Sequence, residues 1–165
     1  MSESSRLDDL RRRVQKDPAS IAFAQLAEEL RREGLCDEAV AVARAGLTRH
    51  PTYLSAHVTL GRALLHLNQF DEARSELERV LQGAPQNLAA LRGLADLHRR
   101  RQDLPAALRY YQAALALAPN DPDLERAVSD LRPQVPDERA AAAERAARTV
   151  ATLERWLHAI HVARA

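Results

Sequence analysis

The sequence predicts an all-α protein in which antiparallel helix pairs stack as a solenoid, followed by one additional long amphipathic helix. Two observations lead to this fold class. First, strong helix formers dominate the 165 residues, with 32 Ala, 25 Leu and 23 Arg against 5 Gly, and β-branched residues are scarce. Second, proline recurs every 34 residues, at Pro51, Pro85 and Pro119. A fixed period of this length is typical of repeat architectures.

A short motif recurs at the same period and divides the chain into repeats. It reads GLCDEA at 34–39, NQFDEA at 68–73 and QDLPAA at 102–107, and the alignment needs no gap. Each repeat has the pattern of two helices, and one repeat cannot bury its apolar face alone, so neighbouring repeats must stack. We therefore expect three full repeats within residues 20–121, at 20–53, 54–87 and 88–121.

These repeats resemble the tetratricopeptide repeat (TPR) family. The resemblance rests on Leu at position 7, small residues at positions 8 and 20, and proline at position 32. The first three of these positions hold Leu26, Leu60 and Leu94, then Ala27, Gly61 and Ala95, then Ala39, Ala73 and Ala107. The sequence departs from the family at positions 4 and 11, which hold Phe23, His57 and Leu91, and Leu30, Leu64 and His98. The resemblance implies a right-handed TPR-type solenoid with a concave groove.

The second repeat illustrates the expected helices. Its first helix is predicted over 54–67 and its second over 71–81, where Asp71 caps the start. Pro85 ends the pair. Small side chains at Gly61 and Ala73 let the two helices approach closely.

The ends of the chain differ from the repeats. Residues 1–19 are predicted to hold an N-terminal capping helix, and 122–131 a second capping helix that begins at Pro122. A proline-containing linker at 132–136 then precedes a C-terminal amphipathic helix over 137–165.

Composition excludes several classes of function. The net charge is only +1, so a general nucleic-acid binder is not expected. There is no apolar run of about 18 residues, so no membrane insertion is expected. The single cysteine, Cys36, indicates a reducing compartment and hence the cytoplasm. The excess of Arg over Lys favours a GC-rich, bacterial source.

The sequence carries no signature of catalysis or cofactor binding. It lacks the phosphate-loop, dinucleotide-binding, nucleophile-elbow and zinc-protease motifs, so we expect a non-enzymatic protein with no cofactor and no metal site. Cys36 falls on a packing position and is interpreted as a structural thiol. His57 and His98 also occupy core positions and are expected to be hydrogen-bonded and half-buried. His158 and His161 are interpreted as polar interface residues rather than metal ligands.

The TPR resemblance implies a partner-binding groove lined by positions 2, 5, 9, 12 and 13 of the first helix of each repeat. Carried onto this sequence, these positions are Ile21, Ala24, Glu28, Arg31, Arg32, Ser55, Val58, Arg62, Leu65, His66, Ala89, Arg92, Asp96, Arg99 and Arg100. Six are Arg and two are acidic, so this face should attract an acidic or extended protein segment. The predicted partner-binding residues are Arg31, Arg32, Arg62, His66, Arg92, Asp96, Arg99 and Arg100.

Two alternatives limit this interpretation. Exposed helix faces of an Arg-rich protein carry Arg even when they bind no ligand, so a face that is merely solvated is an alternative interpretation. The family members that hold the C-terminal carboxylate of chaperone tails use Lys and Asn at set groove positions. The matching positions here hold Ala24, Glu28, Thr59 and Arg62. A chaperone-tail receptor is therefore not predicted.

The C-terminal helix is a second candidate interaction surface. Apolar residues follow one another at spacings of three and four through Ala143, Ala146, Val150, Leu153, Leu157 and Ile160, with Trp156 beside them. The predicted helix interface is Val150, Leu153, Trp156, Leu157 and Ile160. We favour a helix that packs on the last repeat and also contributes to a homodimer through 137–165. Two alternatives remain: the helix packs only on its own solenoid, or it inserts into the groove of a different protein.

Overall fold

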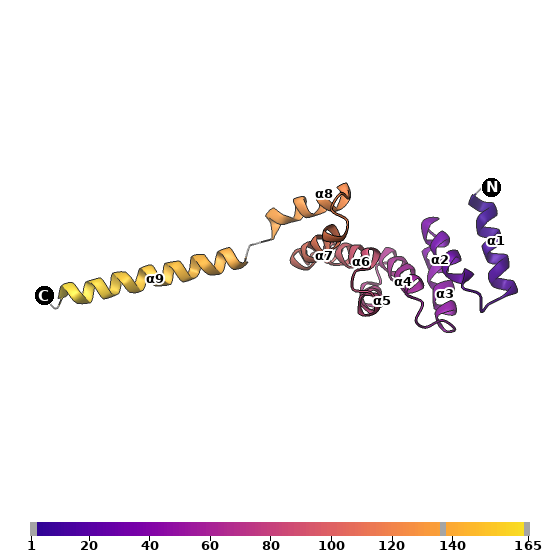
Figure 1. The fold of residues 1–165 in the computed structure, drawn as a ribbon, viewed down its shortest axis with the longest axis horizontal. Coiled ribbons are helices and arrows are strands. Elements are labelled where there is room, and N and C mark those ends of the chain that lie inside the picture. Colours follow the sequence, from indigo (N-terminus) through magenta and orange to yellow (C-terminus); the bar gives the residue numbers. More distant parts are fainter. Residues whose placement is uncertain (1–2, 136–137, 164–165) are drawn as a thin grey trace.

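The computed structural model describes the backbone of residues 3–135 and 138–163, and the side chains of 6–135 and 142–156 (Figure 1). The helices are α1 (Glu3–Lys16), α2 (Ala22–Arg32), α3 (Cys36–Leu47), α4 (Leu54–His66), α5 (Phe70–Gly83), α6 (Leu88–Arg100), α7 (Leu104–Leu117), α8 (Pro122–Leu131) and α9 (Glu138–Ala163), with a 3-10 turn η1 (Arg132–Gln134). These ranges contain no strand, which confirms the all-α prediction. Within them, no helix combines the length and the apolar character needed to span a bilayer.

The helices pair as α2 with α3, α4 with α5, and α6 with α7, and each pair packs on the next. The first helices of the pairs, α2, α4 and α6, also contact one another in order, so they form one layer of the solenoid. At the two ends, α1 packs on α2 and α8 packs on α7. This is the predicted solenoid of stacked helix pairs.

Small residues set the distance between the paired helices. A Cβ added to Gly61 of α4 would lie 2.7 Å from Leu77 Cγ of α5 and 3.3 Å from the carbonyl oxygen of Ala73. Gly46 of α3 lies closer still to its neighbour, because a Cβ there would lie 1.9 Å from Phe23 Cδ2. The alanines at positions 8 and 20 have no exposed surface: Ala27, Ala39, Ala73, Ala95 and Ala107. The prediction that small side chains permit close approach is confirmed.

The turn within each pair uses one left-handed residue. Gly34, Asn68 and Gln102 follow α2, α4 and α6 with φ of 79°, 59° and 63°. After α4, the N–H of Gln69 donates to the Leu64 carbonyl at 2.9 Å and the N–H of Asn68 donates to the Leu65 carbonyl at 3.2 Å. The same two bonds follow α2 and α6, so all three turns are Schellman motifs.

Side-chain caps begin three of the helices, but not the one predicted from the sequence. Asn87, Asp103 and Asp121 precede α6, α7 and α8, and the carboxamide or carboxylate of each accepts a backbone N–H of the first turn. The prediction that Asp71 caps α5 is wrong. The helix begins one residue earlier, at Phe70, so Asp71 lies within the first turn, where its charge still complements the helix dipole.

The two histidines at core positions are hydrogen-bonded, as predicted. His57 is buried, with Nδ1 2.5 Å from Glu76 Oε2 and Nε2 2.8 Å from the Pro51 carbonyl oxygen. His98 stacks on Tyr110, and its Nδ1 lies 3.0 Å from Asp103 Oδ2. Cys36 is buried, in agreement with its interpretation as a structural thiol.

One type of ion pair recurs along the second helices of the repeats. Arg44 of α3 pairs with Glu72 of α5, and Arg11 of α1 pairs with Glu38 of α3 with 2.8 Å between Nη2 and Oε2. Arg11 lies 33 residues before Arg44, and Glu38 lies 34 before Glu72. The N-terminal helix α1 therefore contacts the first repeat as the second helix of the first repeat contacts the second repeat.

The array ends before α9, although α9 begins in register with it. Glu138 follows Leu104, the first residue of α7, by 34 residues, as Leu104 follows Phe70. The position of the left-handed turn residue is Pro136 in the sequence, and proline φ is restricted to about −65°. Moreover, the buried positions of Leu77 and Val80 correspond to Arg145 and Arg148, so α9 lacks the apolar face that packs on a first helix.

Accordingly, α9 projects away from the α8 end of the solenoid (Figure 1). Every residue from 142 to 156 is exposed. The expectation that this helix packs on the last repeat is therefore not met, because the arginines at its packing positions would have to be buried.

Candidate functional site

The predicted groove is the exposed face of the layer formed by α2, α4 and α6. The structure removes three predicted residues from this face. Ala24, Val58 and Leu65 are buried in the apolar core between the helices. Ile21 precedes α2 and is exposed. The accessible part of the face therefore consists mainly of charged and polar side chains.

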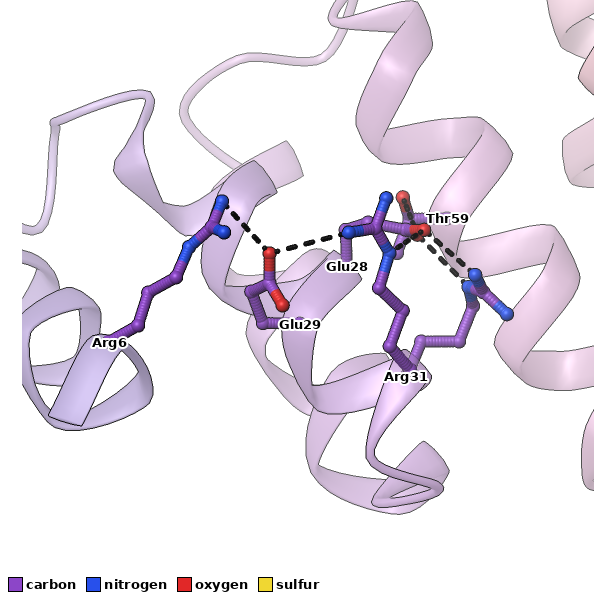
Figure 2. A network of polar contacts seen from close by, with 6 residues as sticks. Arg6, Glu28, Glu29, Arg31 and Thr59 are labelled. Carbon is purple, nitrogen blue, oxygen red and sulfur yellow. Dashed lines mark hydrogen bonds and ion pairs between the residues drawn. The ribbon is translucent and has the colours of Figure 1, made fainter. Parts of the chain in front are cut away.

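Glu28 of α2 organises the side chains at the first-repeat end of the groove. Its carboxylate accepts hydrogen bonds from Arg31 Nη2 at 2.7 Å, Arg31 Nε at 2.9 Å and Arg32 Nε at 3.2 Å. Thr59 of α4 donates a further hydrogen bond at 3.1 Å. Figure 2 shows Glu28 between Arg31 and Thr59, with Arg6 of α1 reaching the neighbouring Glu29. The charges of Arg31 and Arg32 are thus largely satisfied within the chain.

The pKa of Glu28 reflects this network. Burial is the largest single influence and raises the pKa, but the hydrogen bond and charge of Arg31, the hydrogen bond from Thr59 and the charge of Arg62 all lower the pKa. Together they lower the pKa of Glu28 from 4.5 to about 2. The carboxylate therefore remains ionised at neutral pH and holds Arg31 in place.

The third-repeat end of the groove is also internally paired. Arg92 Nη1 donates to Asp121 Oδ2 at 2.8 Å. Asp96 accepts a hydrogen bond from the Tyr111 hydroxyl, and Arg99 lies over the Tyr111 ring, 5.9 Å from its centroid. Burial, followed by the hydrogen bond and charge of Asp96, raises the pKa of Tyr111, so the hydroxyl keeps its proton and donates.

Arg62 of α4 lies between these two paired ends. Among the described residues it has no ion pair within 4.0 Å, and its side chain is partly buried. Burial, followed by the charge of Arg31, lowers the pKa of Arg62, and the carboxylates of Glu28 and Asp96 oppose this. The guanidinium thus experiences charges from both the first and the third repeat.

The remaining predicted residues of this face are Arg100 and His66. Arg100 Nη1 donates to the Leu65 carbonyl oxygen at 2.7 Å, which leaves its other N–H groups available. His66 is exposed, and its pKa is lowered by partial burial and then by the charges of Arg100, Arg31 and Arg62. The charges of Arg62 and Arg100 thus both act on His66, and we call these three residues the central cluster.

Sequence reasoning missed three residues that bind side chains of this face: Thr59, Tyr111 and Asp121. Asp121 could have been found, because an Asp directly before Pro122 is a typical helix start. Thr59 and Tyr111 gave no such signal, because their partners Glu28 and Asp96 lie in other helices.

The second candidate surface, the apolar stripe of α9, is exposed where the structure describes it. The exposed fractions are 53% for Val150, 54% for Leu153 and 62% for Trp156. The side chains of Leu157, Ile160, His158 and His161 lie outside the described residues. In the described part of the chain, no three His, Cys, Asp or Glu side chains come together as metal ligands.

Known proteins match both the sequence and the fold. The tetratricopeptide repeat family model matches residues 24–87 and 58–122, which together span more than half of the chain. The bacteriophage adsorption protein A of Escherichia coli (strain K12) is 28% identical over 128 residues, which cover 78% of this chain and 12% of that protein. The chain thus spans only a small part of that relative.

Three solved structures illustrate the similarity in fold. MamA from Desulfovibrio magneticus RS-1, residues 41 to the end, superposes with a TM-score of 0.72 at 23% identity, covering 93% of this chain and 86% of that one. YrrB, a TPR protein with an unusual peptide-binding site, gives 0.65 at 18% identity, covering 74% and 63%. The second TPR domain of human RPAP3, in complex with the HSP70 peptide SGPTIEEVD, gives 0.62 at 14% identity, covering 69% and 95%.

Proposed function

Because the chain belongs to the tetratricopeptide repeat family, we propose that it is a non-enzymatic adaptor or scaffold that binds an acidic or extended segment of a partner protein. The proposed binding surface is the groove face of α2, α4 and α6. The solved YrrB and RPAP3 structures are described as peptide-binding, which supports a peptide as the kind of ligand. The proposal includes neither nucleic acid nor membrane as a partner, and it places the adaptor in the cytoplasm of a bacterium.

The observation that carries this proposal is how the Arg62 side chain is paired, compared with the other arginines of the groove. Each of the other five arginines of the predicted groove contacts a carboxylate or a carbonyl oxygen of its own chain. Arg62 has a partly buried side chain but no carboxylate partner among the described residues. A guanidinium pairs well with a carboxylate through two parallel hydrogen bonds, and a partly immobilised side chain loses little entropy when it does so. An acidic side chain of a partner is the ligand that fits this position.

This assignment narrows the site predicted from the sequence. Arg62, His66 and Arg100 form the part of the groove that would contact the ligand. Arg31, Arg32, Arg92, Asp96 and Arg99 would act mainly through one another, by keeping the two ends of the groove in place.

The test compares two charge reversals with a defined probe, a fluorescein-labelled peptide of eight glutamates. Arg62→Glu should weaken binding by about tenfold or more in fluorescence anisotropy. Arg109→Glu is the matched control, because Arg109 is exposed on α7, outside the groove layer, and the change in net charge is the same. Equal weakening by both variants, or none by Arg62→Glu, would contradict the proposal.

A second candidate function is self-association through α9. It is favoured by the exposure of Val150, Leu153 and Trp156 on a helix that projects from the solenoid, because a contiguous exposed apolar stripe usually marks an interaction surface. Light scattering should show a dimer that Leu153→Asp combined with Leu157→Asp converts to a monomer. A wild-type protein that remains monomeric at high concentration would exclude this function.

A further inference from the structure

The apolar stripe of α9 is graded in size along the helix. Its first residues, Ala143 and Ala146, are small, and its last residues, Leu157 and Ile160, are large. Between them, Val150 and Leu153 are more than half exposed. The spacing of three and four residues is that of a helix that pairs with another helix in a left-handed coiled coil.

The size gradient distinguishes the two ways in which identical helices can pair. In a parallel pair, each layer holds the same residue twice, so Ala would meet Ala at one end and Ile would meet Ile at the other. The distance between the helices would then have to change along the pair. In an antiparallel pair centred between Val150 and Leu153, each layer holds one smaller and one larger side chain. The layers are Ala143 with Ile160, Ala146 with Leu157, and Val150 with Leu153.

We propose that α9 pairs antiparallel with α9 of a second copy of this chain, with Ala146 opposite Leu157. This inference rests on the second candidate function and specifies the geometry of that association. The total side-chain volume then varies much less from layer to layer than in a parallel pair, so the helices can keep a nearly even spacing, which close packing of the side chains requires.

The residues that flank the stripe are compatible with this arrangement. Trp156 would lie beside Thr149 of the second copy, where a small side chain leaves room for the indole. Glu154 would lie beside Ala147, so the flanking positions bring no like charges together. Arg145, Arg148 and Arg155 are exposed and lie off the stripe, where they remain in water.

The area and the position of the solenoids also agree with a second copy. Two tryptophans and eight branched aliphatic side chains would bury on the order of 1,000 Å², which is about the size that a specific interface needs. The solenoid lies at the N-terminal end of α9, and α9 has 26 residues, a length of about 39 Å. An antiparallel pair therefore holds the two solenoids at opposite ends, whereas a parallel pair brings them to the same end.

The experiment uses the full chain with Cys36→Ala, so that introduced cysteines are the only thiols. Ala146→Cys and Leu157→Cys are prepared separately and oxidised either alone or after mixing. Residues 146 and 157 are separated by about 16 Å along a helix, whereas a disulfide needs Cα atoms within about 7 Å. The proposal expects a covalent dimer in the mixture and little in either protein alone.

Each outcome is informative when light scattering is measured in parallel. A dimer in which Ala146→Cys alone forms the disulfide is parallel, which overturns this inference but keeps self-association. A dimer that forms no disulfide in any sample uses another surface, which overturns the inference as well. A monomer at high concentration excludes both.

Fluorescence provides a second readout, because Trp156 is the only tryptophan of the chain. Its emission should shift to shorter wavelength as the protein concentration rises, since the indole leaves water. The Leu153→Asp and Leu157→Asp double variant should keep the emission of an exposed indole at every concentration. Emission that does not change while the wild type dimerises would contradict the placement of Trp156 at the interface.

Discussion

Thr59 of α4 donates a hydrogen bond across the boundary between two repeats to Glu28 of α2, with 3.1 Å between Oγ1 and Oε2. Glu28 also binds Arg31, so one carboxylate joins the first repeat to the second. The bond lies on the groove face, which means that the shape of the proposed binding surface depends on a group that titrates in acid.

Glu28→Gln should reduce the dependence of stability on acid. The folded-state pKa of Glu28 is about 2, below the ordinary value of 4.5. A depressed pKa contributes stability that is present above the unfolded-state pKa and is lost as pH falls from about 4.5 towards 2. The wild type should therefore lose more stability than Glu28→Gln over this range in urea titrations followed by circular dichroism. At pH 7 the variant should be less stable by about 1.5–3 kcal/mol, the range for hydrogen bonds to a charged group. Parallel pH profiles for the two proteins would contradict this assignment.

Gly46→Ala should destabilise the protein by about 1–3 kcal/mol, because the added methyl group would overlap the Phe23 ring in the closely packed first pair. Gly83→Ala is the matched control. The nearest atoms to a Cβ at residue 83 belong to Leu54 at 3.4 Å, an ordinary contact, so stability should be unchanged or slightly higher. The melting temperatures of both variants are measured by thermal unfolding. Equal melting temperatures would contradict the prediction, because they would show that α2 and α3 can rearrange around the methyl group.

Gln102→Gly should stabilise the protein by about 1 kcal/mol. Gln102 has a φ of 63°, and the left-handed region strains a residue with a Cβ but not glycine. Gln82→Gly, an exposed position inside α5, should lower the stability by about the same amount, because there glycine only adds freedom to the unfolded chain. Chemical denaturation measures both changes. A loss of stability in both variants would mean that the Gln102 side chain makes a contribution larger than the strain.

Arg44 and Glu72 should show a small but measurable coupling. Both side chains are about half exposed, and such pairs contribute roughly 0.2–1 kcal/mol. Arg44→Glu should therefore destabilise the protein, and adding Glu72→Arg should restore most of the loss. The coupling should weaken in 1 M salt, where the screening length is about 3 Å. A coupling of zero at low salt would show that the pair does not help to align α3 with α5.

Much of the fold could be predicted from the sequence, because it depends on residues that recur at one period. Buried alanines and glycines mark where helices meet, and Pro85 follows the end of α5. The residue at the left-handed turn position differs between the repeats, and its conformation is evident only from the structure. Gly and Asn are common residue types in left-handed turns, so Gly34 and Asn68 could have been recognised. Gln is an ordinary helix former, so the sequence does not distinguish Gln102 from a helical residue.

The charge pattern of the groove was less accessible to sequence reasoning. The predicted residues lie on the expected helices, but the count of arginines gave no information on which are paired. Arg92 binds Asp121, and the two are 29 residues apart in the chain. Arg31, Arg32 and Arg99 pair with carboxylates of their own helices, at spacings that the sequence shows. The partner of Arg92, and the lack of a carboxylate partner for Arg62 among the described residues, are evident only from the three-dimensional stacking.

The contacts of the solenoid are almost entirely between neighbours. From α1 to α8, each helix contacts the helices directly before and after it, and α4 also contacts α2 and α6. In such a one-dimensional array, amide hydrogens at either end exchange through local fraying, whereas those in the middle exchange only when several interfaces open together. The central cluster combines Arg62 and His66 of the middle repeat with Arg100 of the next. The proposed ligand site therefore lies mainly in the segment that opens least often, and a bound segment that also contacts the outer repeats would suppress their fraying.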